Sequence, residues 1–188
     1  MLLRAVILAL WTAAASAAEG LSVETLRRGS AVEVWAYALI ESRYATVWAT
    51  LTDFDRLSEF VPGMSSSRVL EHRGNTWVVE QRGETRFLFF THPVEVTVLA
   101  TARPPHALDV RLLTGNLKRL DGGYRVEEMQ GGKIALRWRG LVEPAALPPL
   151  LGELVMRASI EAQFAGMVRE IERREGARRR APASGEPR

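Results

Sequence analysis

Residues 148–174 read PPLLGELVMRASIEAQFAGMVREIERR, and this stretch decides the fold. No proline interrupts it after Pro149, so the whole stretch can form one helix. Its apolar residues recur at steps of three and four, the spacing that places side chains on one face of a helix. They are Leu151, Leu154, Val155, Ala158, Ala162, Ala165 and Val168. The sequence therefore predicts a long amphipathic helix near the C-terminus.

A second apolar stripe lies beside the first and widens the apolar face of this helix. It consists of Ile160, Phe164, Met167 and Ile171. A helix that is so long and so apolar is not stable alone in water, so it needs a large concave partner. The strands that precede it are the partner that the chain offers. Since alanines occupy part of the first stripe, we expect the helix and a curved sheet to leave space between them.

The region before the helix reads as one strand, two short helices and about six further strands. Residues 21–30 are mostly polar and predict only a lead-in. Alternation of side chains predicts a strand over residues 31–40, and helix spacing follows at residues 44–51, with a second helical turn over residues 56–60. The remaining six strands are predicted at residues 67–72, 76–82, 85–102, 107–114, 124–129 and 134–142, and two glycine-containing turn signals bracket residues 117–120.

Turn signals separate these strands. Gly74 marks a hairpin, and Gly122-Gly123 and Gly131-Gly132 are interpreted as turns. Pro93 predicts a bulge or an edge position within residues 85–102. An antiparallel sheet with its helices gathered on one side is an α+β fold.

The two ends of the chain differ from this pattern. A basic lead, a short apolar run and Ala15-Ser16-Ala17 predict a secretory signal peptide over residues 1–18, and so a periplasmic or secreted protein. The alternative is an N-terminal membrane anchor, for which the apolar run is short. The folded domain is predicted over residues 22–175, and an Arg-rich disordered tail over residues 176–188.

The charge distribution argues against nucleic-acid binding. The chain has a net charge of +3 and a pI near 9.8. Arg4 and four arginines after Gly176 account for five of the 25 basic side chains, and Glu186 for one of the 22 acidic ones, so residues 19–175 carry a net charge of −1. A phosphate-tracking surface is therefore not expected. The arginines of the tail are either solvated or in peripheral contact with anionic lipid headgroups.

Several sequence features resemble the START-like (SRPBCC) superfamily, which includes polyketide cyclase/dehydrase and coenzyme Q-binding START-like proteins. They are Val47-Trp48, Leu51-Thr52-Asp53-Phe54, Phe60-Val61-Pro62-Gly63-Met64, Gly115-Asn116-Leu117-Lys118, Gly123-Tyr124-Arg125-Val126 and the proline-rich residues 143–149. The resemblance covers about residues 30–175. It implies a helix-grip fold, a seven-stranded antiparallel sheet around the C-terminal helix. It also implies binding of sterols, lipids, quinones or polyketides, with a minority of enzymes and no invariant catalytic residue.

The candidate site is an apolar cavity between the sheet and the long helix. Strand residues of one parity and the predicted helix face supply its lining. The candidate ligand-binding residues are Phe90, His92, Val96, Val98, Val110, Leu112, Leu136, Trp138, Leu154, Ala158 and Ala162. Trp138 and Phe90 offer ring surfaces for stacking, and His92 a polar contact.

Signals for other chemistry are sparse. The chain has no cysteine, which excludes disulfides and thiol catalysis. His72 and His106 are expected in solvated turns, and no spacing of residues indicates a metal site, a cofactor or a phosphate loop. We therefore predict no catalytic residue, no metal and no cofactor.

Three hypotheses for function follow. The first is binding or transport of a hydrophobic small molecule, such as a lipid, a quinone or a polyketide-like compound. The second is a cyclase/dehydrase-type enzyme that uses the same cavity, with His92, Glu80 or Arg82 as proton-transfer or oxyanion groups. The third is a structural or partner-binding domain with a filled core, in which Ala162→Leu would overpack the interior.

Overall fold

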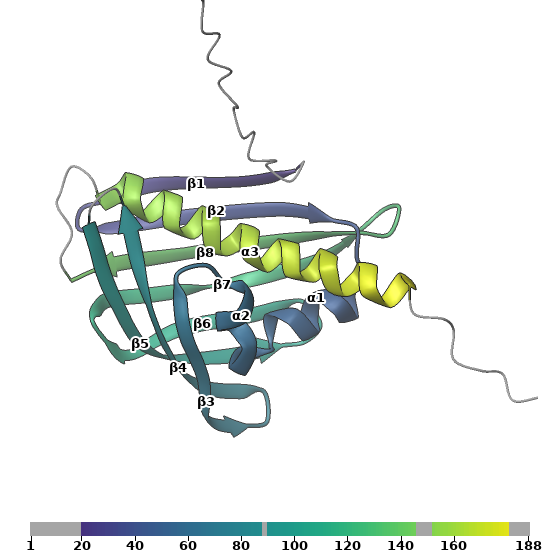
Figure 1. Cartoon of the computed structure of the whole chain (residues 1–188), viewed down its shortest axis with the longest axis horizontal. Coiled ribbons are helices and arrows are strands. Elements are labelled where there is room, and N and C mark those ends of the chain that lie inside the picture. Colours follow the sequence, from purple (N-terminus) through teal and green to yellow (C-terminus); the bar gives the residue numbers. More distant parts are fainter. Residues whose placement is uncertain (1–19, 88–89, 146–151, 181–188) are drawn as a thin grey trace, which may run out of the picture.

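The computed structural model describes residues 20–87, 90–145 and 152–180 (Figure 1). Its strands form one antiparallel sheet in the order β1-β2-β8-β7-β6-β5-β4-β3. The strands are β1 (Leu21–Arg28), β2 (Ala31–Ile40), β3 (Met64–Arg73), β4 (Thr76–Phe87), β5 (Phe90–Arg103), β6 (Ala107–Gly115), β7 (Leu117–Met129) and β8 (Lys133–Pro144). The helices are α1 (Tyr44–Leu51), the 3-10 turn η1 (Phe54–Arg56), α2 (Leu57–Phe60) and α3 (Gly152–Arg180).

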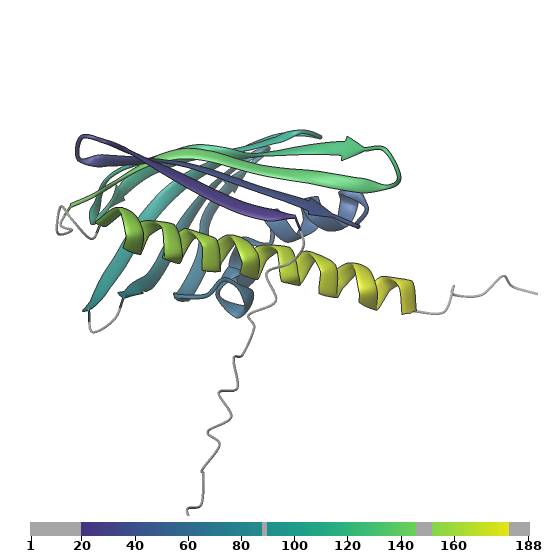
Figure 2. The same cartoon turned by 90° about the horizontal axis from the view of Figure 1, so that it is seen from above.

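The sheet bends around α3, which crosses its concave face (Figures 1 and 2). The short helices lie near the C-terminal half of α3, where Val47 and Leu51 of α1 are buried. This arrangement confirms the predicted α+β fold. No helix among residues 20–87, 90–145 and 152–180 is long and apolar enough to cross a membrane.

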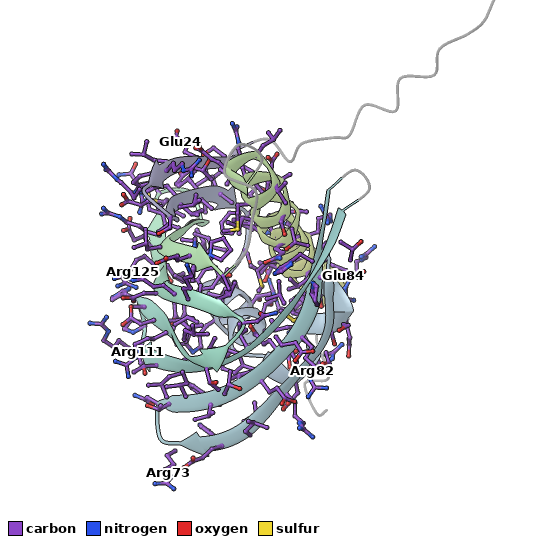
Figure 3. All side chains as sticks on the ribbon, turned by 90° about the vertical axis from the view of Figure 1, so that its left-hand side faces the viewer. Glu24, Arg73, Arg82, Glu84, Arg111 and Arg125 are labelled. Atoms are coloured by element: carbon purple, nitrogen blue, oxygen red, sulfur yellow. The ribbon has the colours of Figure 1, made fainter. Side chains whose placement is uncertain are left out.

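The core lies between the concave face and α3. Strand β2 illustrates why the core forms there. Its buried residues alternate with half-buried ones, and they include Val34, Ala36, Ala38 and Ile40. Alternate side chains of a strand point to the same side, so the apolar parity of each strand meets the helix. The outer face carries charges, and Arg111 and Arg125 point away from the molecule in Figure 3.

The sheet has eight strands, one more than predicted. Residues 21–30, predicted as a polar lead-in, contain β1, which pairs along its full length with β2. Strand β1 lies at the edge of the sheet, and Val23 is its single buried apolar residue. The alternation of apolar and polar side chains along β1 is therefore weak. The prediction therefore lacked one edge strand of the sheet.

Two other strand boundaries were wrong. Residues 85–102 are not one strand, because Thr85 belongs to β4 and Phe87 pairs with Phe90 across a hairpin. Pro93 lies in β5 without a bulge against β4, and the partner strand β6 ends before reaching it, so the edge alternative is correct. Gly122-Gly123 is not a turn but the middle of β7.

Helix α3 continues further than predicted. It ends at Arg180, so residues 176–180 are helical and not part of a disordered tail. Arg178 hydrogen-bonds to Glu175, and arginines in a last turn also complement the helix dipole, which offsets the cost of Gly176. Pro148 and Pro149, where the helix was predicted to begin, lie outside the described residues, as do residues 1–19 and 181–188.

The face of α3 that meets the sheet is rotated from the predicted first stripe towards the second, and only Val155 and Val168 of the first stripe are buried among the described residues. Its buried residues are Val155, Met156, Phe164, Met167, Val168 and Ile171, which include most of the second stripe. Leu154 is 55% exposed, and Ala158 and Ala162 are exposed as well. The stripe with the larger side chains removes more apolar area from water, so it takes the buried position.

Polar contacts fix the C-terminal half of α3. The Glu175 side chain is 2% exposed and accepts hydrogen bonds from Thr46 at 2.5 Å and from Arg178 at 2.5 Å. Arg174 donates to Asp53 at 2.7 Å and to Glu170 at 2.7 Å. These bonds tie α3 to α1 and to the loop before η1, because buried carboxylates require charged or hydroxyl partners.

Candidate ligand-binding cavity

A cavity of about 260 Å³ lies between the concave face of the sheet and α3. Its wall is mainly aliphatic and aromatic. The apolar lining residues are Leu51, Phe54, Leu57, Val61, Met64, Val94, Val96, Val98, Ala100, Leu108, Val110, Leu117, Leu120, Tyr124, Trp138, Val142, Met156, Ile160, Phe164 and Met167. Such a lining suits an apolar ligand with few polar atoms.

The central strands position an aromatic pair in this wall. Tyr124 of β7 lies opposite Trp138 of β8, and their ring centroids are 4.8 Å apart at an interplanar angle of 58°. The indole lies over the facing pair Gly122 and Gly140. A Cβ atom on Gly122 would come within 2.8 Å of Trp138 Cζ2, and one on Gly140 within 3.0 Å. The two glycines therefore make room for the indole.

Helix α3 supplies the facing wall. Met156, Ile160, Phe164 and Met167 recur at steps of three and four and point to the cavity. Two polar residues, Ser159 and Gln163, share this wall, and Gln163 Nε2 donates to Ser159 Oγ at 3.3 Å. The cavity therefore exists although the helix presents large side chains, because the sheet curves away from them.

The polar groups of the cavity are mostly uncharged. Gln81 and Thr85 of β4 and Tyr124 of β7 join the two polar residues of α3. Burial raises the pKa of Tyr124 to about 12, so its hydroxyl stays protonated at physiological pH. The two charged lining residues, Arg82 and Glu84, both belong to β4. Figure 3 shows them on the opposite side of the molecule from Arg111 and Arg125.

The cavity opens beside α3. Gly63, Met64, Glu84 and Ser159 line both the cavity and a neighbouring surface groove. Pro62, Ser65, Ala158 and Ala162 complete that groove. We call this opening between α3 and the β3 to β4 side of the sheet the mouth. Gly63 has a φ of 80°, and its carbonyl accepts a hydrogen bond from the Glu84 N–H at 2.7 Å, which fixes one rim of the mouth.

The structure brings together four of the predicted ligand-binding residues. Val96, Val98, Val110 and Trp138 line the cavity. Ala158 and Ala162 line only the groove at the mouth, because α3 is rotated relative to the prediction.

The other predicted positions do not meet there. Leu136 is fully buried in the core. Leu112 is partly buried and packs against the core, while Leu154 is exposed to solvent. His92 is half-buried and does not line the cavity. The side chain of Phe90 lies outside the described part of the chain.

Sequence reasoning missed Tyr124 as a site residue. The signal was present, since Tyr124 and Val126 share a parity and Val126 is buried. Interpretation of Gly122-Gly123 as a turn made Tyr124 the first residue of the predicted strand 124–129 and not the middle of a long strand, so Tyr124 was not considered for the site. The helix residues Ile160 and Phe164 were recognised as apolar but assigned to the neighbouring stripe.

The residues considered for proton transfer do not gather in the cavity. Glu80 binds Arg68 at 3.1 Å and Arg82 at 3.5 Å, and of these three residues Arg82 alone is among the described lining residues of the cavity. His72 stacks on Trp77 with a centroid distance of 4.6 Å, and His106 is exposed in a turn. Within residues 20–87, 90–145 and 152–180, no group of three or more histidines and carboxylates is placed to hold a metal ion.

Comparison with known families identifies the relationship. Residues 40–174, well over half of the chain, match the family model described as polyketide cyclase / dehydrase and lipid transport. The chain belongs to this family. No curated protein sequence matches it. Membership confirms the START-like relationship that the sequence features indicated, whereas a specific relation to coenzyme Q-binding proteins remains a prediction.

Solved structures share the fold at low sequence identity. The chain is similar to the Zhui aromatase/cyclase from Streptomyces sp. R1128, with a TM-score of 0.68, 15% identity, and coverage of 82% of this chain and 99% of that one. A STAR-related lipid transfer protein from Xanthomonas axonopodis gives a TM-score of 0.65 at 12% identity, covering 82% and 94%. The lipid transfer domain of human StarD13 gives 0.63 at 14% identity, covering 83% and 86%. The helix-grip fold of START-like proteins is thereby established for this chain.

Proposed function

We propose that the protein binds a hydrophobic small molecule in the cavity between the sheet and α3 and carries it. The observation that supports this function is the apolar cavity of about 260 Å³ with an open mouth. Transfer of apolar ligand surface from water into such a cavity contributes about 25 cal/mol per Å², before the costs of association. Membership in a family that includes lipid transport supports the same conclusion.

A cyclase/dehydrase activity in the same cavity is the alternative, since the family description includes it and the Zhui structure is titled an aromatase/cyclase. Nothing in the cavity favours it over binding. His92 and Glu80 do not line the cavity, and the Arg82 side chain is 55% exposed. General acid and base groups have to reach the substrate within hydrogen-bond distance, and His92 and Glu80 lie outside the cavity lining.

The third hypothesis, a filled core, does not fit the cavity. The substitution Ala162→Leu does not test whether the core is filled, because Ala162 lies exposed in the groove at the mouth. A leucine there would narrow the mouth and leave the interior untouched.

A cavity-filling variant tests the proposed function. Val110→Phe adds a ring to the lining, whereas Leu113→Phe adds one to an exposed position on the same strand, where Leu113 is 47% exposed. Purified wild-type protein, extracted with organic solvent and analysed by mass spectrometry, should release a hydrophobic compound. Val110→Phe should lose it and Leu113→Phe should retain it.

The outcome is informative only if both variants fold, which circular dichroism and thermal unfolding establish. Equal recovery from both variants would place the compound outside the cavity. Failure to recover any compound, together with failure to bind palmitate or an aromatic probe in titration, would contradict the proposal.

Export and membrane contact form a second part of the proposal. The predicted signal peptide lies in residues 1–18, and the N-terminal sequence of the protein isolated from its source tests its removal. The arginines at the end of α3 suit anionic headgroups, but Arg179 lies about 30 Å along the helix from Ser159 at the mouth. A membrane bound by these arginines would therefore reach the mouth only with α3 lying along its surface. Sedimentation with phosphatidylserine vesicles, and with phosphatidylcholine vesicles for comparison, tests this contact.

A further inference from the structure

The hydroxyl group of Tyr124 is a polar group of the cavity wall that lies next to the Trp138 ring. The Tyr124 side chain lines the cavity, and its hydroxyl has no hydrogen-bond partner among residues 20–87, 90–145 and 152–180. It is not sealed within protein, in contrast to the Tyr44 hydroxyl, which is buried without a partner. Since Tyr124 lines the cavity and its hydroxyl is not among the sealed polar atoms, that hydroxyl is free to donate a hydrogen bond to a ligand acceptor.

We propose that the cavity selects an uncharged, flat ring compound with a carbonyl-type acceptor, and that the Tyr124 hydroxyl donates a hydrogen bond to this acceptor. This inference rests on the proposed function and names the chemical class of the ligand. The ring would lie against Trp138, whose indole is fixed over Gly122 and Gly140. Offset or tilted contacts between aromatic rings add to the free energy that burial alone provides.

The protonation of the lining fits an uncharged acceptor. Because the pKa of Tyr124 is raised to about 12, its hydroxyl is a donor at every physiological pH. The other uncharged polar groups of the described lining are the amides of Gln81 and Gln163 and the hydroxyls of Thr85 and Ser159. Among the described lining residues the cation is Arg82 of β4, three strands away from β7, so a carboxylate buried beside Tyr124 would carry a large desolvation cost.

The volume of the cavity limits the size of the ligand. An engineered cavity of about 150 Å³ holds one benzene molecule. The cavity of about 260 Å³ therefore has room for about two fused rings. A longer substituent would leave through the mouth, which Glu84 of β4 and Ser159 of α3 help to line.

Tyr124 lies away from the mouth, and this position predicts how the ligand is oriented in the cavity. Tyr124 belongs to β7, and the mouth lies beside β4, three strands away in the sheet. At about 4.8 Å between neighbouring strands the separation is about 14 Å. A ligand that reached Tyr124 would thus have its acceptor at the inner wall and its tail towards the opening.

Calorimetric titration with two matched probes tests the inference. The compounds 2-methyl-1,4-naphthoquinone and 2-methylnaphthalene have the same two rings and differ in the carbonyl groups. The chain has no cysteine that the quinone could modify. Tyr124→Phe removes only the hydroxyl, so it should weaken quinone binding about three- to tenfold and leave the affinity for 2-methylnaphthalene unchanged.

A matched control is Tyr37→Phe, which removes a hydroxyl from the outer face of β2, where Arg137 lies 5.5 Å from the Tyr37 ring. It should change neither affinity. Equal quinone affinity of wild type and Tyr124→Phe, or equal weakening of both probes, would overturn the role of Tyr124.

Palmitate separates failure of this inference from failure of the proposed function. Binding of palmitate alone, abolished by Val110→Phe, would overturn the ring-selective cavity and leave hydrophobic ligand binding intact. Absence of binding for palmitate and both ring compounds would overturn the proposed function as well.

Discussion

At the scale of single residues, the wall of the cavity depends on two positions that carry no side chain. Gly122 and Gly140 face each other across β7 and β8, and the Trp138 indole occupies the space above them. Any other residue at Gly122 would bring its Cβ atom to 2.7 Å from Gly140 Cα and from the Arg139 carbonyl oxygen. Neither backbone atom can move away without disturbing the strand pairing.

The first prediction at this scale concerns Gly122→Ala. We expect it to reduce the free energy of unfolding by about 1 to 3 kcal/mol, as overpacking does, and to displace the Trp138 indole. Urea unfolding measures the first effect, and the near-UV circular dichroism of the indole the second. Gly140→Ala should cost less, because its nearest contact is 3.0 Å, with the movable Trp138 ring. The reverse order of the two losses would contradict this account.

The lining residues of the sheet were predictable where alternation was regular. Val96, Val98 and Val110 followed from the two-residue period, because a strand can bury only one parity against a helix. Tyr124 did not, since glycines usually mark turns and the sequence does not reveal that an indole from the next strand needs the space. The position of the Tyr124 ring in the cavity wall depends on tertiary packing and has no signature in the sequence.

At the scale of elements, α3 has two differently held halves. Towards its C-terminus the helix approaches the loop after α2 so closely that a Cβ atom on Gly166 would clash with the Phe60 carbonyl oxygen and the Pro62 ring. Arg174 strengthens this contact, with its guanidinium 5.4 Å from the centre of the Phe60 ring. The N-terminal half instead borders the cavity and the mouth.

We therefore expect glycine-to-alanine substitution at two positions of α3 to change the melting temperature in opposite directions. Glycine to alanine inside a helix stabilises it by about 1 kcal/mol when space allows. Gly176 has only an ordinary contact at 3.7 Å with the end of the Arg180 side chain, so Gly176→Ala should raise the melting temperature. Gly166→Ala should lower it, because the clash with backbone outweighs the gain in propensity. Thermal unfolding of both variants measures the two shifts in melting temperature. Stabilisation by Gly166→Ala would contradict close packing of α3 against α2.

The existence of α3 and its partner sheet was predictable, whereas its rotation was not. Two adjacent apolar stripes gave a wide apolar arc, and periodicity alone does not determine which edge of such an arc meets the sheet. Strand β1 escaped prediction because its burial comes from pairing at an edge and from contact with α3. The long strand β7 was divided for a similar reason, since local turn signals were given more weight than pairing on both sides.

At the scale of the whole molecule, two buried carboxylates join α3 to the rest of the fold. Hydrogen bonds from Arg178, and then from Thr46, hold the pKa of Glu175 down to about 2 despite its burial. Arg173 and Arg174 do the same for Glu170, whose pKa is also about 2. Both groups have pKa values near 4.3 when unfolded. Each therefore stabilises the folded state above about pH 4.5, and this stabilisation is lost as the pH falls towards 2.

Acid unfolding tests this linkage. Solvent screens these ion pairs because Arg173 and Arg178 are exposed. Each carboxylate should therefore contribute on the order of 1 to 2 kcal/mol to the free energy of unfolding at neutral pH. Glu175→Gln should lower the urea midpoint at pH 7, and its difference from wild type should shrink between pH 4.5 and 2.5. Glu172→Gln on the exposed side of the same helix is the control and should show no such loss. A difference that stays constant with pH would contradict the assignment to Glu175.

The separation of the cavity from the most deeply buried core has a practical consequence. Ile40, Val47 and Ile171 are fully inaccessible and do not line the cavity, whereas Val94, Ile160 and Gln163 line it without belonging to that innermost set. Evolution or an engineer can therefore alter the second group to accept new molecules while the first group keeps the scaffold intact. A library of such replacements is a direct starting point for biosensors built on this chain.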